Sequence, residues 1–248
     1  MTLHEFFTQH SKVAIACSGG VDSSYLLYAA QRAGADVTAY YVKSVFQPSF
    51  ELEDAKSLTG GLGIPLKILT ADVLVDPRIR KNPENRCYYC KHRIFSTILQ
   101  AAKEDGCPVL CDGTNASDAA AERPGMKALS ELSVLSPLRI CGITKDEIRK
   151  ASMQAGLFTW DKPSYACLAT RIPTGEEITE EALSNTEAAE AFLRSLGFYD
   201  LRVRKMGTAA RIQVPEEQLE EVLNCRERIL LELGTYYSGV CLDLKPRE

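Results

Sequence analysis

The sequence predicts an α/β fold, a doubly wound parallel sheet followed by a smaller α+β domain. Short apolar runs alternate with segments of helical periodicity in the first part of the chain, as expected for parallel strands joined by helices. The first run ends abruptly in a Ser-Gly-Gly turn that opens a helix. After a segment over 161–177 that contains prolines and little periodicity, the pattern restarts. We therefore expect two domains, 1–165 and 166–248.

The composition is that of an ordinary globular protein, with 45% hydrophobic and 25% charged residues. The net charge of -4 argues against nucleic acid or an anionic membrane as a partner. The first ten residues lack the basic start and the apolar core of a signal peptide, so we expect a cytoplasmic protein. The nine cysteines are an odd number, which argues against a disulfide framework in such a chain.

Each element of the first domain has its own signal. The expected strands lie over 13–16, 36–42, 65–70 and 109–114. Helices are expected directly after the first strand, over 50–62 and over 94–103. A later helix begins at Thr144, which forms a capping box with Glu147. Ligands bind at the carboxyl ends of the strands in such sheets, so the residues after these strands are the first candidates for a site.

The second domain is expected to be a small α+β unit. Thr179 caps a helix that ends near 196. Residues 215–233 are expected to be helical. The expected strands lie over 201–204, 210–214 and 239–244.

The turn after the first strand has the most specific pattern in the chain. Its residues are Ser18, Gly19, Gly20, Val21, Asp22 and Ser23. The glycines let the backbone turn tightly and approach a ligand, and the following helix offers free N–H groups to an anion. No lysine follows Gly20, so the turn is not a P-loop. It resembles the PP-loop of ATP pyrophosphatases, which split ATP into AMP and pyrophosphate. The alternative is a turn that only connects a strand to a helix.

Polar residues also follow the second and fourth strands. Ser44 follows the second strand, and the fourth leads into Asp112, Gly113, Thr114, Asn115 and Asp118. We expect these residues to form an edge of the nucleotide site. Asp22, Asp112 and Asp118 are candidate ligands for Mg²⁺, which prefers carboxylates together with phosphate oxygens. The alternative for the 112–118 loop is a polar turn without a ligand.

Three cysteines stand in surroundings that favour chemistry. Cys87 and Cys90 lie at the start of a predicted helix between basic residues, which favours the thiolate form. Cys167 lies in a distant loop. Three thiolates suit an iron–sulfur cluster with one open iron. The alternatives are three unconnected cysteines, or a zinc ion held by these cysteines and His92.

Several arginines are candidates for binding phosphate. Arg202 and Arg204 alternate on one predicted strand and so point to the same side, while Arg171 lies near the junction of the domains. The alternative for the pair is a solvated, charged strand face. Glu190 lies in the middle of a predicted helix, where a surface carboxylate is the ordinary expectation.

Taken together, these motifs resemble the LarE family of ATP-dependent sulfur transferases, which make the nickel-pincer nucleotide of lactate racemase. The matching stretches are 18–23, 82–91, 112–115, 123–125, 167–175 and 202–204. The resemblance implies that ATP adenylates a carboxylate of pyridinium-3,5-biscarboxylic acid mononucleotide, and that sulfur then replaces AMP. It implies ATP and Mg²⁺ as cofactors, and a hexamer.

The resemblance also suggests roles for individual residues. Cys87, Cys90 and Cys167 resemble the ligands of a [4Fe-4S] cluster in some members, whereas other members sacrifice one cysteine, which would be Cys167 here. Arg171, Arg202 and Arg204 would hold the substrate phosphate or the leaving pyrophosphate, and Glu190 resembles an acidic residue near the active site.

Three other functions fit parts of the sequence. A tRNA thiolase of the same superfamily is the main alternative, although the acidic balance argues against it. An amide-forming PP-loop ligase would give the Cys87–Cys90 pair no role. A nucleotide-sensing module would bind ATP without forming AMP.

Overall fold

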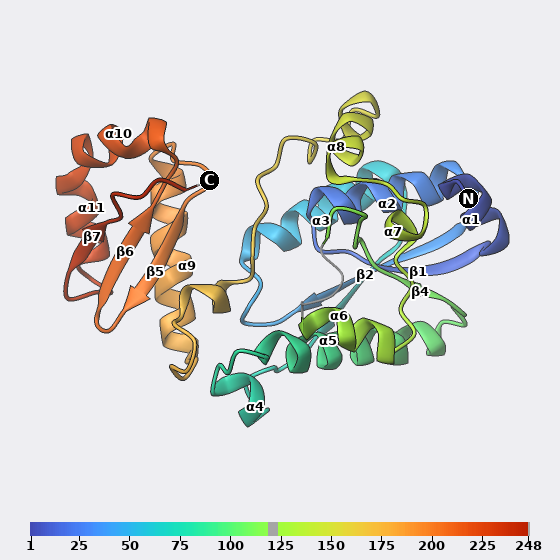
Figure 1. Ribbon diagram of the computed structural model, residues 1–248, viewed down its shortest axis with the longest axis horizontal. Coiled ribbons are helices and arrows are strands. Elements are labelled where there is room, and N and C mark those ends of the chain that lie inside the picture. Colours follow the sequence, from blue (N-terminus) through green and yellow to red (C-terminus); the bar gives the residue numbers. More distant parts are fainter. Residues whose placement is uncertain (119–123, 248) are drawn as a thin grey trace. The chain divides into compact units, whose positions relative to one another are not determined.

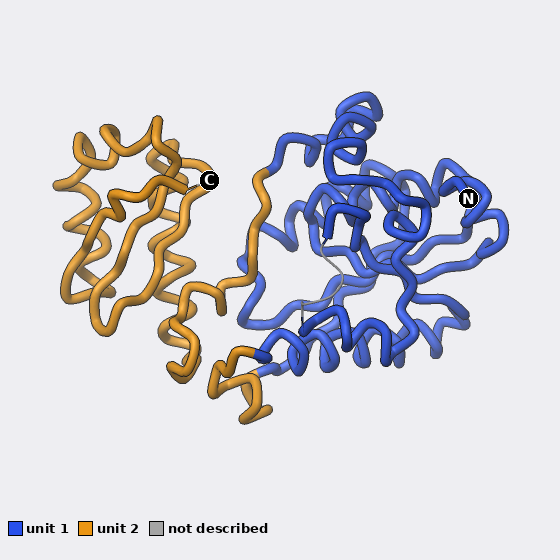
Figure 2. Tube along the Cα trace, in the orientation of Figure 1, with its two compact units in different colours: residues 1–73, 85–162 blue, residues 74–84, 163–248 orange. Residues whose placement is uncertain are grey.

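The computed structural model describes residues 1–118 and 124–247, which form two compact units (Figure 2). Unit 1 comprises residues 1–73 and 85–162, and unit 2 comprises residues 74–84 and 163–248. The segment 74–84 belongs to unit 2 because its backbone carbonyls accept hydrogen bonds there. Arg80 O accepts from Ile178 N at 2.8 Å, and Asn82 O accepts from Gly175 N at 2.8 Å.

Unit 1 is built on a four-stranded sheet in the order β3-β2-β1-β4, with every strand pair parallel (Figure 1). Its strands are β1 (Lys12–Ala16), β2 (Asp36–Lys43), β3 (Leu66–Thr70) and β4 (Leu110–Cys111). Val13, Ala14 and Ile15 of β1 are fully buried, as a central parallel strand requires. The predicted doubly wound α/β fold is confirmed.

Helices cover both faces of this sheet, with α2 and α3 on one side and α5 and α6 on the other (Figure 1). The helices of unit 1 are α1 (Leu3–Gln9), α2 (Val21–Arg32), α3 (Ser49–Leu62), α5 (Arg86–Glu104), α6 (Pro124–Glu131), α7 (Pro137–Ile140) and α8 (Lys145–Gln154). The capping box of Thr144 with Glu147 is confirmed at α8.

Two boundaries in unit 1 differ from the prediction. The helix expected over 94–103 begins earlier, at Arg86, so the Cys87–Cys90 pair lies inside α5. The fourth strand is limited to Leu110–Cys111, and on its outer side it makes only an isolated parallel bridge to Leu135, in which Asp112 N donates to Leu135 O at 2.9 Å. Arg123, part of one motif, lies outside the described residues.

Unit 2 holds a three-stranded sheet in the order β5-β6-β7, in which β5 and β6 are antiparallel and β6 and β7 are parallel. The strands are β5 (Arg202–Met206), β6 (Ala209–Gln213) and β7 (Val240–Leu242). The helical elements are α4 (Pro77–Arg80), η1 (Leu168–Arg171), α9 (Glu180–Ser195), η2 (Glu216–Gln218), α10 (Leu219–Asn224) and α11 (Arg226–Leu233).

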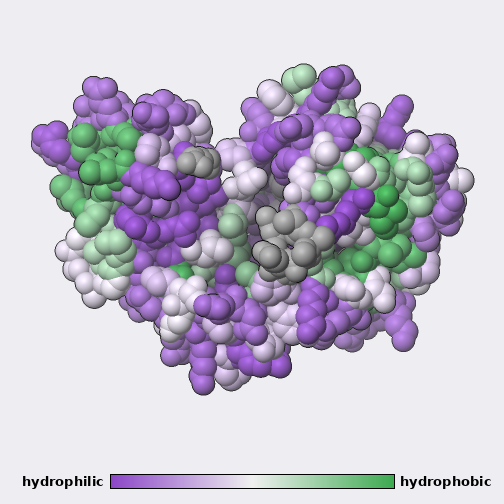
Figure 3. Space-filling view, viewed as in Figure 1, coloured by the Kyte–Doolittle hydropathy of each residue, from purple (hydrophilic) through white to green (hydrophobic). Residues whose placement is uncertain are grey.

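The core of unit 2 includes Leu193 from α9, Val203 from β5 and Ile212 from β6. The helical segment expected over 215–233 is present as η2, α10 and α11, and Cys225, with φ -88° and ψ 4°, separates α10 from α11. Leu223, Leu230 and Leu231 on these two helices are more than half exposed. Figure 3 shows an apolar area of the surface in the region of α10 and α11. In the described part of the chain, no helix is long and apolar enough to cross a membrane.

Candidate functional site

The topology of unit 1 places two loops at one edge of its sheet. From β1 the chain runs outward to β2 and β3, and it later returns to add β4 on the opposite side of β1. Ligands of doubly wound sheets bind at this reversal of strand order, beyond the carboxyl ends of the strands. The 18–23 turn follows β1 and the 112–118 loop follows β4, so both candidate loops lie at the expected place.

The turn after β1 is stabilised by hydrogen bonds of its own serine hydroxyl groups. Ser23 Oγ and Ser24 Oγ donate to Gly20 O at 3.1 and 2.8 Å, and Ser18 N donates to Ser23 Oγ at 3.3 Å. Gly20 is the N-cap of α2, and no side chain caps this helix end. The first turn of α2 therefore offers N–H groups and the positive end of the helix dipole to an anion.

Gly19 and Gly113 are required by close approaches of backbone. A Cβ atom on Gly19, which adopts φ +72°, would lie 2.8 Å from Glu51 O of α3. A Cβ atom on Gly113 would lie 2.9 Å from Ser23 N and 3.2 Å from the carbonyl carbon of Asp22. The loop after β4 thus packs directly against the start of α2, and together they form a cradle of backbone amides and hydroxyls.

Asp22 meets a lysine that the sequence analysis did not single out. Lys145 Nζ donates to Asp22 Oδ2 at 2.7 Å, and Asn115 Nδ2 donates to Asp22 Oδ1 at 3.3 Å. Lys145 N also donates to Ser117 Oγ at 2.9 Å. Lys145 is the first residue of α8, directly after the cap Thr144. The capping box in the sequence correctly predicted where α8 begins, but no local pattern indicated that Lys145 contacts Asp22, 123 positions earlier in the chain.

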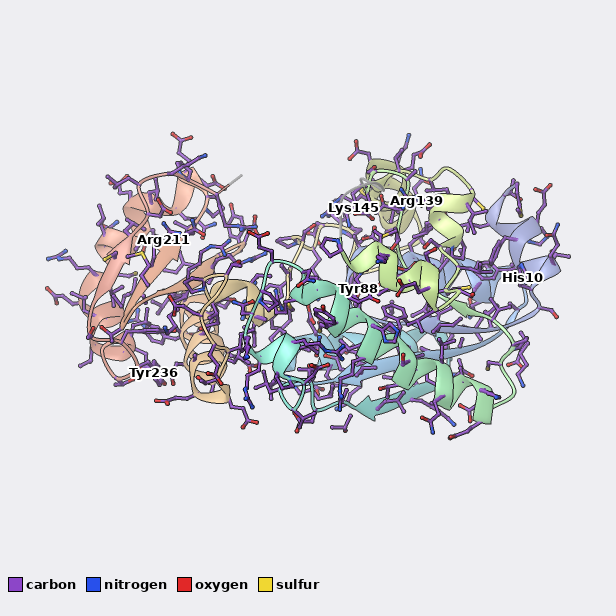
Figure 4. The ribbon with its side chains drawn as sticks, turned by 60° about the horizontal axis from the view of Figure 1, so that its bottom comes forward. His10, Tyr88, Arg139, Lys145, Arg211 and Tyr236 are labelled. Carbon is purple, nitrogen blue, oxygen red and sulfur yellow. The ribbon has the colours of Figure 1, made fainter. Side chains whose placement is uncertain are left out.

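The 112–118 loop is braced from several sides. Lys145 binds it through Ser117, and Arg139 Nη2 donates to Asp118 O at 3.2 Å (both labelled in Figure 4). Asp112 is buried and accepts from Thr114 Oγ1 and, at 2.6 Å, from Ser136 Oγ. Asp118 Oδ2 accepts from Asn115 N at 3.1 Å. Of the three candidate magnesium ligands, Asp22 is therefore the one at the start of α2 and beside the phosphate cradle.

Ser44 serves the turn after β2. Its hydroxyl donates to Gln47 Oε1 at 2.6 Å and accepts from Phe46 N at 3.2 Å. The side chain is buried, and these contacts stabilise the connection to α3.

The three candidate cysteines are divided between the units. Cys87 and Cys90 lie in the first turns of α5 in unit 1, where Cys87 is exposed and Cys90 is buried. Cys167 belongs to unit 2 and directly precedes η1. Two thiols one helical turn apart fit two corners of a metal centre. Among residues 1–118 and 124–247, no group of three or more histidine, cysteine or acidic side chains is gathered in a form that could hold a metal ion.

Glu190 is completely buried, which corrects the expectation of a surface carboxylate. Its Oε1 accepts from Arg171 Nε at 2.8 Å and from Val203 N at 3.0 Å. Its Oε2 accepts from Tyr165 Oη at 2.6 Å, and from Arg171 Nη2 and Arg194 Nη2 at 3.2 Å each. Burial raises the pKa of Glu190, but the hydrogen bonds and the charge of Arg171 outweigh burial, and the net pKa is lowered. The carboxylate is therefore ionised and fully engaged.

Arg171 is buried beside Glu190 and holds the backbone around Cys167. Its Nη1 donates to Ala166 O at 2.6 Å, to Cys167 O at 3.2 Å and to Thr170 Oγ1 at 2.9 Å. The guanidinium carbon also lies 4.4 Å from the centre of the Tyr165 ring, within the range of a cation–π contact.

Arg202, Arg204 and Arg211 share one face of the β5–β6 ladder. Arg204 lies directly opposite Arg211, and like charges in this position repel. Burial and the charges of Arg171 and Arg247 lower the pKa of Arg202 to about 10. Arg204 donates through Nε to Gln213 and through Nη1 to Thr170 O, whereas its Nη2 has no hydrogen-bond partner among the described residues. The face has an excess of positive charge that an anion would relieve.

The PP-loop class of nucleotide-binding enzymes fits this arrangement: a Ser-Gly-Gly-Val-Asp-Ser turn follows a strand of a parallel sheet and opens a helix. A family model described as the tRNA methyl transferase HUP domain matches residues 11–71.

Two curated relatives match nearly the whole chain. An uncharacterised protein of Synechocystis is 38% identical over 88% of this chain and 82% of its own length. The pyridinium-3,5-bisthiocarboxylic acid mononucleotide synthase of Lactiplantibacillus plantarum is 34% identical over 94% of this chain and 86% of its own length. The chain belongs to the LarE family.

A more distant relative is a tRNA-specific 2-thiouridylase of Pseudothermotoga lettingae, 27% identical over 67% of this chain and 58% of its own length.

Proposed function

We propose that the protein is an ATP-dependent sulfur transferase that adenylates pyridinium-3,5-biscarboxylic acid mononucleotide and converts its carboxylates to thiocarboxylates. The relationship to a pyridinium-3,5-bisthiocarboxylic acid mononucleotide synthase over 94% of the chain carries this proposal. The cradle of unit 1, the thiols and the arginine face of unit 2 support it independently.

ATP would bind with its phosphates at the 18–23 turn and the start of α2. A carboxylate oxygen of the substrate attacks the α-phosphorus, the bond from this phosphorus to the bridging oxygen breaks, and pyrophosphate leaves. Asp22 would hold Mg²⁺ and Lys145 would turn from Asp22 toward a phosphate. Both side chains are about a quarter exposed, so the pair can separate at low cost.

The arginine face of unit 2 would bind the phosphate of the mononucleotide. Arg204 suits this role best, because its Nη2 has no partner among the described residues and Arg211 lies opposite to it. Arg202 is more constrained, since it donates to Leu201 O at 2.7 Å and to Ser164 O at 2.6 Å.

Sulfur would reach the activated carboxyl by one of two routes, both of which release AMP. In one, sulfide displaces AMP and the thiocarboxylate forms directly. Cys87, Cys90 and Cys167 would be the ligands of a [4Fe-4S] cluster, which would supply the sulfide when bound. In the other, the Cys167 thiolate displaces AMP to form a thioester. Loss of the Cys167 Cα proton and cleavage of its Cβ–Sγ bond then release the thiocarboxylate and leave dehydroalanine.

Turnover of the purified, anaerobically reconstituted protein tests the proposal. With ATP, Mg²⁺ and the pyridinium dicarboxylate mononucleotide, we expect AMP, pyrophosphate and a thiocarboxylate product. Cys167→Ala should abolish the product, whereas Cys225→Ala, a matched change elsewhere in unit 2, should not. ATP binding without AMP formation would refute the proposal in favour of a nucleotide sensor.

Mass spectrometry of the protein after turnover separates the two sulfur routes. Loss of the mass of hydrogen sulfide at Cys167 identifies the sacrificial route. An intact chain with product identifies the sulfide route, in which serine variants of Cys87, Cys90 and Cys167 must each lose the visible iron–sulfur absorption.

A tRNA thiolase is the second candidate, because the family model and the Pseudothermotoga relative both carry tRNA enzyme names. The net charge of -4 argues against it. Tight binding of tRNA that weakens steeply with salt would favour this candidate over the first.

We propose in addition that the protein is a homo-oligomer that uses the exposed leucines of α10 and α11. Contiguous exposed apolar patches mark protein–protein interfaces, and these three leucines, each more than half exposed, are the candidates for such a surface in unit 2.

A further inference from the structure

Lys162 makes a contact with the phosphate cradle that the proposed reaction does not use. Its Nζ donates to Gly19 O at 3.0 Å and forms an ion pair with Asp54 of α3. The ammonium also lies 5.2 Å from the centre of the Phe50 ring. The lysine side chain is only 19% exposed. The Lys162 ammonium is thus largely shielded from solvent, paired with Asp54 and hydrogen-bonded to the carbonyl of Gly19, unlike a solvated surface charge.

The backbone of Lys162 is itself fixed by α8. Arg149 Nη2 donates to Lys162 O at 2.8 Å, and Arg149 Nη1 donates to Trp160 O at 2.7 Å. Lys162 N donates to Thr159 O at 3.2 Å. The lysine therefore approaches the turn from a rigid base, and every group in this chain of contacts belongs to unit 1.

The hydrogen bond at Gly19 O determines which way the next N–H points. The carbonyl of Gly19 and the N–H of Gly20 belong to one trans peptide plane, so they point in opposite directions. Because Lys162 holds the carbonyl on the α3 side, the Gly20 N–H turns toward the inside of the turn, where Ser18 Oγ lies 3.4 Å away. Glycines on both sides of this bond leave the plane free to flip unless something holds it.

We propose that Lys162 is a positioning residue for ATP: it fixes the Gly19–Gly20 peptide so that the Gly20 N–H faces the nucleotide phosphates. This inference deepens the proposed function and rests on it for the identity of the nucleotide. Asp54 keeps the ammonium in place. Lys162 is also the last residue of unit 1 and precedes Cys167 by five residues in the sequence.

The test is an NMR experiment with labelled glycine, in which few signals are expected. The chain contains only two Gly–Gly peptides, Gly19–Gly20 and Gly60–Gly61. Labelling glycine with ¹³C at the carbonyl and ¹⁵N at the amide gives one carbonyl–amide correlation signal for each. Lys162→Met should move the Gly19–Gly20 signal in the nucleotide-free protein and leave the Gly60–Gly61 signal of α3 unchanged. Lys162→Arg should keep the wild-type position, and Lys150→Met, an exposed lysine of α8, is the matched control.

Calorimetric titration with Mg·ATP supplies the second readout. Lys162→Met should weaken ATP binding about tenfold, the effect of losing a single charge-assisted hydrogen bond, with the affinity for the pyridinium mononucleotide unchanged. Asp54→Asn should weaken it less, because the bond to Gly19 O remains. An unmoved Gly19–Gly20 signal or an unchanged ATP affinity in Lys162→Met overturns the inference. If the wild-type protein fails to bind ATP, the proposed function fails instead, and the peptide signal still decides whether Lys162 fixes the turn.

Discussion

Replacing Glu190 with glutamine probes the buried hydrogen-bond network of unit 2. The carboxylate accepts five hydrogen bonds, of which three come from Arg171 and Arg194. A glutamine has one acceptor oxygen, so its NH₂ group must face donors on the other side. If the oxygen takes the Oε1 position, the NH₂ group meets two guanidinium nitrogens where Oε2 stood, and Arg171 loses its buried counter-charge.

The magnitude follows from burial. Both side chains of the Arg171–Glu190 pair are fully buried, and breaking such a pair by removing one partner costs about 3–5 kcal/mol. By contrast, Arg194 is one-third exposed, so solvent screens its charge and its single bond contributes less than those of Arg171. For a unit of this size, the Glu190→Gln change should lower the melting temperature by more than about 10 °C.

Hydrogen exchange locates the effect at one amide. Val203 N donates to Glu190 Oε1, so the loss of stability in this buried network should speed exchange of the Val203 amide in Glu190→Gln and leave the β1 amides of unit 1 protected. Glu181→Gln, the same change at an exposed position of α9, is the control and should alter neither measurement by more than a small amount. A Glu190→Gln protein with wild-type melting and a protected Val203 amide would refute the view that this network holds unit 2 together.

Three further predictions follow from the same contacts. Gly113→Ala should weaken ATP binding, because the added Cβ would lie 2.9 Å from Ser23 N and push the 112–118 loop away from the start of α2. The circular dichroism spectrum should stay unchanged, and an unchanged ATP affinity in calorimetry would contradict this prediction. The free energy of unfolding of unit 2 should fall as the pH drops below about 4.5. The folded state lowers the pKa of Glu190, so its stabilising contribution is complete above the unfolded pKa of 4.5 and is lost as the pH falls through the folded pKa. Glu190→Gln should show a weaker dependence of unfolding on pH in the acid range. Leu231→Glu should shift light scattering toward a smaller species, since Leu231 is 80% exposed, and an unchanged mass would exclude α11 from the interface.

Local patterns predicted much of unit 1, because each of its elements has a local signal. Buried parallel strands are continuous apolar runs, and the 18–23 turn combines glycines, hydroxyls and a helix start in one segment. The cap at Thr144 was correct for the same reason. The partners of these residues were beyond local patterns, since Lys145 meets Asp22 across 123 positions and Lys162 meets Gly19 across 143.

In unit 2, residue type and local periodicity did not predict the burial of Glu190 or the break at Cys225. A glutamate in mid-helix ordinarily faces solvent. The i,i+4 spacing to Arg194 is a local signal, but nothing near Glu190 in sequence indicates that Arg171 and Tyr165 bind it. The helical segment expected over 215–233 is interrupted at Cys225, and the sequence pattern did not indicate this break because its hydrophobic periodicity continues across it. The register that sets Arg204 opposite Arg211 depends on how the two strands pair, which the sequence of either strand alone leaves undetermined.

The contacts of Arg171 argue for a division of labour among the arginines of unit 2. Its Nε and Nη2 are bonded to Glu190, its Nη1 serves three acceptors around Cys167, and the side chain is 1% exposed. To hold a substrate phosphate it would have to give up bonds inside a buried network, which is costly, whereas Arg204 needs only to use a donor that already lacks a partner among the described residues. We therefore expect Arg171→Lys to disturb sulfur transfer through the backbone at Cys167, with loss of kcat, and Arg204→Lys to raise KM for the mononucleotide. Steady-state kinetics of the two variants decide the point: a raised KM with unchanged kcat in Arg171→Lys would show that Arg171 binds the phosphate directly.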